Sequence, residues 1–148
     1  MAGFVLSSPS FAESGAIPMK HSCDGEDLSP ALAWERAPAG TRAFALIVDD
    51  PDARGFVHWV AYDIPGATAA LPEGVQPADL PQGRTDFGRS GYGGPCPPSG
   101  MHHYVFTLYA LSRSLGLGGS PTAADARRAM AGLVLGEAKL TGTYTRKR

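Results

Sequence analysis

Apolar positions along this chain fall into short runs that glycine and proline separate. Residues 43–48 form a continuous apolar run, which is typical of a strand buried on both faces. Residues 140–145 instead alternate apolar or glycine positions with threonine, as expected for a strand with one wetter face. The runs predict six strands, at residues 4–6, 31–35, 43–49, 56–63, 104–111 and 138–145.

One helix is predicted over residues 123–130. Thr122 and Asp125 resemble a capping box, although Asp stands where Glu or Gln is usual. Gly132 disfavours continuation of the helix, and a second short helical turn is predicted over residues 133–137. Frequent glycine and proline predict a long irregular excursion between residues 65 and 89. Strands followed by a late helix favour a mainly β architecture, a β-sandwich.

Composition narrows the class of protein further. The 148 residues suffice for one core and predict a single domain over residues 1–148. The net charge of −1 gives no reason to expect nucleic acid or a polybasic membrane contact as a partner. Apolar runs stay well below the roughly 18 residues of a membrane-spanning helix, and residues 1–6 lack signal-peptide features. A cytoplasmic location without integral membrane contact is therefore predicted.

The two cysteines, Cys23 and Cys96, allow one disulfide without requiring it. Free cysteines are often buried and cytosolic thiols are normally reduced, so two small reduced thiols are the favoured interpretation. A redox pair is the alternative, because Cys96 lies in an unusually rigid loop. The spacing matches no common zinc motif, and no metal site is predicted.

That loop, residues 91–100, is dense in glycine and proline. Proline fixes φ and removes a backbone donor, while glycine adopts backbone angles that other residues avoid. The loop is therefore expected to have one shape, with N–H groups free to meet a ligand. It continues through His102 and His103 into a predicted strand that starts at Tyr104, so it resembles one wall of a binding site.

A second wall is predicted where residues 43–49 end in Asp50-Pro51-Asp52 and the next strand brings His58. Each residue could instead have a purely structural role, since aspartate and proline favour turns and a buried histidine can pair with a carboxylate. Tyr104 fits an inward-facing core aromatic equally well. Together, the polar groups converge as in a small-ligand pocket.

These motifs resemble one protein family. Asp50-Pro51-Asp52-Ala53, His58-Trp59 and residues 94–104 are similar to the phosphatidylethanolamine-binding protein family, in its bacterial and archaeal Raf-kinase-inhibitor-like branch. Residues 21–30, 84–88 and 142–144 also follow the pattern of that branch, so the resemblance covers nearly the whole chain. It implies an antiparallel β-sandwich in which a large central sheet packs on a smaller one.

The resemblance also implies a small surface pocket for phosphate or a phosphorylated headgroup. Carried over residue by residue, its lining is Asp50, Asp52, His58, Gly94, Pro95, Cys96, Pro97, His102 and Tyr104. The expected ligand is a small anion or zwitterion, with no cofactor, no metal and no catalytic residue. The carboxylates would orient protonated histidines or receive the ammonium of an ethanolamine headgroup.

Other functions stay open from the sequence. Relatives named as inhibitors imply a kinase or protease as a protein partner, which the sequence does not identify, and a homodimer is left open. A small hydrolase is the competing class, with Asp50, His58 and Cys96 as an acid–histidine–thiol system. Little around Cys96, which lies between prolines, favours its thiolate.

The chain departs from the family pattern at two positions near the predicted pocket. Arg54 replaces the usual proline after Asp-Pro-Asp-Ala, which frees the turn and brings a cation near the two carboxylates. His103 replaces the usual arginine and removes a planar bidentate donor. If that arginine pairs with an acidic residue, His103 is expected to make the pair weaker and pH-dependent.

Overall fold

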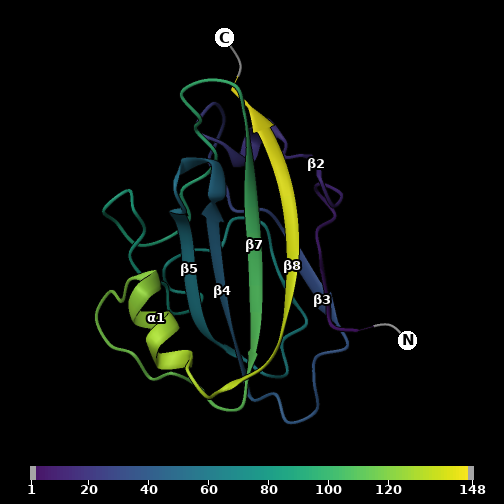
Figure 1. Ribbon diagram of the computed structural model, residues 1–148, viewed down its shortest axis with the longest axis vertical. Coiled ribbons are helices and arrows are strands. Elements are labelled where there is room, and N and C mark those ends of the chain that lie inside the picture. The colour runs from purple at the N-terminus through teal and green to yellow at the C-terminus, as the bar shows by residue number, and fades with distance from the viewer. Residues whose placement is uncertain (1–2, 147–148) are drawn as a thin grey trace.

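Two β-sheets pack face to face in the computed structural model, which describes residues 3–146 (Figure 1). The large sheet has the order β2-β8-β7-β4-β5, and the small sheet has the order β1-β3-β6. The strands of the large sheet are β2 (Gly15–Ala16), β4 (Ala43–Asp50), β5 (Phe56–Pro65), β7 (Met101–Leu111) and β8 (Val134–Thr145). Those of the small sheet are β1 (Val5–Ser7), β3 (Leu32–Glu35) and β6 (Ala70–Leu71). The predicted mainly β sandwich is confirmed.

The large sheet is covered on both faces. Between the sheets, a core cluster includes Trp34, Phe44, Trp59 and Phe106. On the opposite face, α1 (Ala123–Met130) lies beside β5 and closes a second cluster (Figure 1). Strand β4 lies between both clusters, which explains why its sequence is a continuous apolar run rather than an alternating one.

The helix prediction is confirmed together with its capping box. The Thr122 hydroxyl accepts from the backbone N–H of Asp125, and the Asp125 carboxylate accepts from the backbone N–H of Thr122. The second helical turn predicted over residues 133–137 is wrong. Gly132, at φ 80°, turns the chain, and Val134 pairs directly with Leu111 at the start of β8. Pairing with β7 therefore overrides the local helix preference of this segment.

Two further differences from the predicted strands involve short or shifted elements. The two-residue strands β2 and β6 were not predicted, and β6 lies within the predicted irregular excursion. Strand β7 begins at Met101, three positions earlier than predicted, because its first residues pair with the end of β8. His102 and His103 are consequently strand residues, whose side chains point to opposite faces of the sheet. Single turns of 3-10 helix, η1 (Met19–His21) and η2 (Pro51–Ala53), complete the fold.

The excursion before β7 covers the outer edge of β5. Backbone N–H groups of Gly83, Asp86 and Gly93 donate to carbonyls of β5, those of Val60, Val57 and His58 respectively. An exposed strand edge is thereby paired, as stable β-proteins require. The same contacts bring residues 84–93 against the end of β5 that carries His58.

Candidate functional site

A cavity of about 180 Å³ opens where β4 ends and β7 begins. Residues of alternate strand positions, such as Asp50 on β4 and His102 and Tyr104 on β7, line it because they point to the same face of the sheet. The complete lining is Asp50, Ala53, Phe56, His58, Phe87, Cys96, Pro97, Pro98, His102 and Tyr104. Two imidazoles thus share a small and otherwise largely apolar space.

Asp50 fixes the ring of His102. The Asp50 side chain is almost fully buried and accepts two hydrogen bonds. One comes from the backbone N–H of Asp52, at 2.8 Å from Oδ1, and caps η2. The other comes from Nδ1 of His102, at 2.6 Å from Oδ2. Because Nδ1 is engaged inside the protein, Nε2 is the His102 nitrogen left for a ligand.

His58 is held in an aromatic box at the other side of the cavity. Its Nδ1–H donates to the carbonyl of Gly93 at 2.7 Å. The rings of Phe56, Phe87 and Tyr104 meet the imidazole edge-on, with centroids 5.1–5.2 Å away. Burial lowers the pKa of His58 below 6.5, against opposing contributions from the Gly93 carbonyl and the Asp50 charge. At neutral pH the ring is therefore neutral, and its Nε2 is a hydrogen-bond acceptor.

Tyr104 completes this polar wall as a neutral phenol. Burial, together with the charges of Asp50 and Asp52, raises the pKa of the Tyr104 hydroxyl far above its usual range. The hydroxyl keeps its proton at physiological pH. It can therefore donate a hydrogen bond or accept one, but it does not add a charge to the cavity.

The glycine–proline loop is tied to an earlier segment of the chain by a disulfide. Cys23 and Cys96 are bonded, so the favoured prediction of two reduced thiols is wrong, whereas redox activity of the pair stays a prediction. The backbone N–H of Cys23 donates to the carbonyl of Pro95 at 3.1 Å, and that of Gly94 donates to the carboxylate of Asp27 at 2.8 Å. Because the sequence separation is 73 residues, local pattern could not reveal this contact.

Gly94 explains why the loop needs glycine at this point. A Cβ at this position would lie 2.0 Å from the carbonyl oxygen of His21 and 2.5 Å from the Asp27 carboxylate. No side chain fits that space, so the close approach of the two segments requires glycine. Gly94 and Pro95 shape the loop but do not line the cavity.

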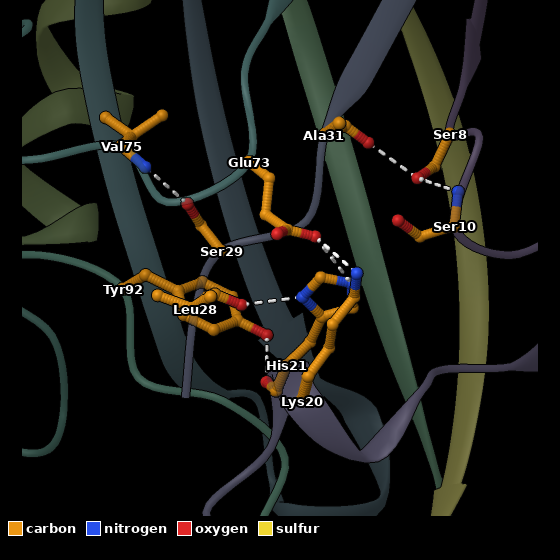
Figure 2. A network of polar contacts seen from close by, with 10 residues as sticks. All are labelled: Ser8, Ser10, Lys20, His21, Leu28, Ser29, Ala31, Glu73, Val75 and Tyr92. Carbon is orange, nitrogen blue, oxygen red and sulfur yellow. Dashed lines mark hydrogen bonds and ion pairs between the residues drawn. The ribbon is translucent and has the colours of Figure 1, made fainter. Parts of the chain in front are cut away.

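A buried polar network holds the partner segment in place (Figure 2). The His21 side chain is fully buried, and its Nδ1–H donates to the carbonyl of Leu28 at 2.8 Å. The hydroxyl of Tyr92, from the glycine–proline loop, donates to the carbonyl of His21 at 2.7 Å. Glu73 binds Lys20 at 2.9 Å and lies 3.8 Å from Nε2 of His21, which has no hydrogen-bond partner among the described residues. Burial lowers the pKa of His21, so this ring is also neutral.

Six of the nine predicted site residues line the cavity, namely Asp50, His58, Cys96, Pro97, His102 and Tyr104. Asp52 does not, because its side chain is exposed and pairs with His103 on the other side of the turn. The sequence did not identify Ala53, Phe56, Phe87 and Pro98 as part of the site. Apolar residues give no chemical signal of their own, although Ala53, Pro98 and Phe87 stand inside the motifs that carry the family resemblance. Whether the lining residues bind a ligand stays a prediction.

The two departures from the family pattern have different structural consequences. Arg54 adopts φ 58°, a left-handed conformation that proline cannot adopt. A chain with the usual proline at this position therefore cannot form the same turn after η2. Its guanidinium forms no ion pair among the described residues, so the expected cation is not paired with a carboxylate. His103 binds Asp52 through both its backbone N–H, at 2.7 Å, and its Nδ1, at 2.9 Å. The acidic partner expected for this position is therefore present.

The chain belongs to the phosphatidylethanolamine-binding protein family, whose sequence model matches residues 7–145. It is 47% identical over 148 residues to a UPF0098 protein of Methanothermobacter thermautotrophicus, covering 95% of this chain and 98% of that one. LppC of Mycobacterium tuberculosis, named as a lipoprotein, is 42% identical over 143 residues, covering 94% and 71%. The crystal structure of Escherichia coli YbcL, described as a new member of the mammalian family, superposes with a TM-score of 0.90 at 31% identity, covering 99% and 100%.

Two further observations concern the described residues alone. They contain no group of three or more histidine, cysteine, aspartate or glutamate side chains arranged to hold a metal ion. No helix among them combines the length and apolar character that crossing a bilayer demands.

Proposed function

We propose that this protein binds a small phosphate-bearing molecule, phosphate itself or a phosphoethanolamine-like headgroup, in the cavity between His58 and His102. The observation that supports this most is the pair of imidazoles in one small cavity. Each has its Nδ1 engaged by the protein. Each therefore offers Nε2 to a ligand in a fixed direction, which limits the ordering cost of binding.

Proton uptake would accompany the binding of an anion. In the empty cavity His58 is neutral at pH 7, because burial lowers its pKa. A phosphate oxygen beside the ring favours the charged imidazolium, which donates a charge-assisted hydrogen bond. The affinity should therefore rise as the pH falls from 7 toward the pKa of the empty site.

The apolar part of the lining favours a ligand with a short carbon chain. Phe56, Phe87, Pro97 and Pro98 can pack against the methylene groups of a headgroup while the imidazoles hold the phosphate. Asp50 is less suited to receive an ammonium group, since both of its oxygens already accept hydrogen bonds. The ammonium of a zwitterion would thus point to solvent and contribute little.

The competing hydrolase loses its nucleophile in this arrangement. With the sulfur of Cys96 in a disulfide, no thiolate is available beside His58. Binding without turnover remains the proposal, and an assay for ester hydrolysis by the oxidised protein tests it. The role as a kinase or protease inhibitor that the family resemblance implies stays a prediction.

The compartment also stays a prediction. Disulfides persist mainly in oxidising compartments, so the Cys23–Cys96 bond and the lipoprotein name of the relative LppC weigh against the cytoplasmic location that the sequence predicts. Alkylation of the two cysteines in intact cells distinguishes the two cases. Labelled thiols would support the cytoplasm, and protected cysteines would support an oxidising compartment.

Titration calorimetry with inorganic phosphate, phosphoethanolamine and sulfate tests the binding proposal. Sulfate keeps its charge across the range, so a pH dependence seen with sulfate belongs to the protein and not to the ligand. We expect saturable binding of all three, stronger at about pH 5.5 than at about pH 7.5, which lie on either side of the ordinary histidine pKa of about 6.5. Absence of saturable binding, or an affinity independent of pH for sulfate, would contradict the proposal.

A further inference from the structure

The two cysteines of the disulfide have different surroundings. Cys23 is exposed at the surface, whereas Cys96 is partly buried and lines the cavity together with His58 and His102. An exposed disulfide is the more labile kind and exchanges with thiols more readily.

We propose that the Cys23–Cys96 disulfide is an exchange site for small thiols, at which Cys23 is the sulfur attacked. The thiolate of a low-molecular-weight thiol bonds to Sγ of Cys23, and the Cys23–Cys96 bond breaks. The electron pair of that bond leaves with Cys96, which becomes a thiolate in the cavity. The thiolate of a second small thiol then bonds to the sulfur of the first, the bond to Cys23 breaks, and its electron pair leaves with Cys23. The products are the dithiol and the disulfide of the small thiol. The small thiol is the reductant, so electrons and atoms balance.

The exposure of the two cysteines determines the direction of the attack. Exchange requires a thiolate to reach one of the two sulfurs, and Cys23 is the more exposed of the two cysteines. The departing Cys96 sulfur stays within a cavity that also holds the phenol of Tyr104, which keeps its proton and can donate a hydrogen bond to a thiolate. Stabilisation of the leaving thiolate speeds exchange.

The surrounding contacts allow the bond to open without loss of the fold. The Cys23 segment is fixed by the network around His21, in which Leu28 and Tyr92 supply partners (Figure 2). The Cys96 loop is fixed by Asp27, which accepts from Gly94, and by the bond between the Cys23 N–H and the Pro95 carbonyl. None of these contacts involves a sulfur atom. Reduction is therefore expected to add a thiol to the cavity wall while both segments keep their positions.

Trapping the first intermediate tests the proposal. The folded protein is incubated with glutathione at about pH 8, close to the ordinary thiol pKa of about 8.5, and quenched with an alkylating agent at successive times. Intact mass spectrometry should show a species that has gained one glutathione and one alkyl group. Peptide mapping should place the glutathione on Cys23 and the alkyl group on Cys96. Glutathione found mainly on Cys96, or reduction that requires a denaturant, would overturn the proposal.

Single-cysteine variants give a second readout. Cys96→Ser leaves the Cys23 thiol, Cys23→Ser leaves the Cys96 thiol, and the double variant is the matched control without an adduct. With oxidised glutathione we expect the Cys96→Ser protein to gain the adduct several-fold faster than the Cys23→Ser protein. Equal rates or the reverse order would contradict the assignment of Cys23. The mass readout needs no cavity ligand, so its failure is distinct from a failure of the phosphate proposal.

A spectrum of the reduced protein completes the test. The far-ultraviolet circular dichroism spectrum of the protein should be unchanged after reduction at about 25 °C. Unfolding on reduction would show that the bond is a structural crosslink, and it would rule out exchange in the folded state.

Discussion

Two acid–histidine pairs lie back to back at the start of β7, and only one of them belongs to the cavity. Asp50 and His102 form the inner pair, with side chains 4% and 16% exposed. Asp52 and His103 form the outer pair, with side chains 42% and 46% exposed. In both pairs a histidine Nδ1 binds a carboxylate oxygen, at 2.6 Å and 2.9 Å. The same chemistry therefore occurs twice, once inside the protein and once in water.

Strand alternation separates the two pairs. His102 and His103 are neighbours on β7, so their side chains point to opposite faces of the sheet. Surface ion pairs contribute little because water screens them and holding them costs side-chain entropy. A buried carboxylate must instead be fully hydrogen-bonded, and each donor it serves depends on it. We therefore expect equivalent substitutions in the two pairs to have very different effects.

The largest difference is expected between Asp50→Ala and Asp52→Ala. Removal of the Asp50 carboxylate leaves the Asp52 N–H and Nδ1 of His102, both partly buried, without their acceptor, at a total cost of about 1–3 kcal/mol. The Asp52 carboxylate serves an exposed histidine, which water can serve instead. Chemical denaturation of both variants measures the two free energies of unfolding. Similar losses would show that burial does not distinguish the pairs.

Gly94→Ala tests whether the inner site depends on the close approach of its loop. The new Cβ would meet the His21 carbonyl at 2.0 Å, so the loop must move, at a cost of about 1–3 kcal/mol. Gly118→Ala is the matched control, because nothing lies within 4 Å of the position. Denaturation should show a loss for Gly94→Ala alone. Binding of phosphate should weaken as well, since Cys96 and Pro97 move with the loop.

Acid should act on the buried histidines before it acts on the outer pair. Burial lowers the pKa of His21 and of His58, so the unfolded chain binds more protons than the folded one below about pH 6.5. Stability from these groups is present above pH 6.5 and is lost as the pH falls toward their folded pKa values. The His103 hydrogen bonds lower the pKa of Asp52, so the stability that the outer pair contributes is lost only as the pH falls below about 3.8.

Histidine NMR titrations and denaturation across the same pH range measure this effect. The His58 ring should titrate below pH 6.5, and the free energy of unfolding should fall before the carboxylates protonate. A His58 midpoint above 6.5, with flat stability down to about pH 5, would contradict the expected direction.

The smallest effect is expected for Pro97→Ala. Alanine restores freedom to the unfolded chain, which lowers the stability by about 0.4–1 kcal/mol if only that term acts. Peptide bonds among the described residues are all trans, so no cost of isomerisation is added. The pocket should respond more than the fold, because Pro97 lines the cavity. Thermal melts and phosphate titrations of the same variant compare the loss of stability with the loss of affinity. An unaltered affinity with a large fall in melting temperature would show that the loop is part of the core.

The sequence predicted the features that depend on local pattern. The apolar run of β4, the α1 capping box and the acidic turn at Asp50 each follow from neighbouring residues. Asp50, His58 and His102 were correctly brought to one cavity because the family motifs name them in order.

Features that depend on register or on distant contacts were missed. The early start of β7 decides that His102 faces the cavity and His103 does not, and this register comes from pairing with β8. The disulfide joins segments that are 73 residues apart. Phe87 joins the site because the excursion folds over the edge of β5 and brings its ring against that of Phe56. Local pattern contains none of this information.

Phosphate titration of His102→Ala and His103→Ala at about pH 6, below the reference histidine pKa of about 6.5, decides whether the inner pair binds the ligand. A hydrogen bond to a charged group contributes about 1.5–3 kcal/mol, so loss of the inner imidazole should weaken binding roughly tenfold or more. His103→Ala should bind phosphate as the unaltered protein does, because its ring lies outside the cavity. Equal losses in the two variants, or no loss in His102→Ala, would contradict the assignment of the inner pair as the binding site.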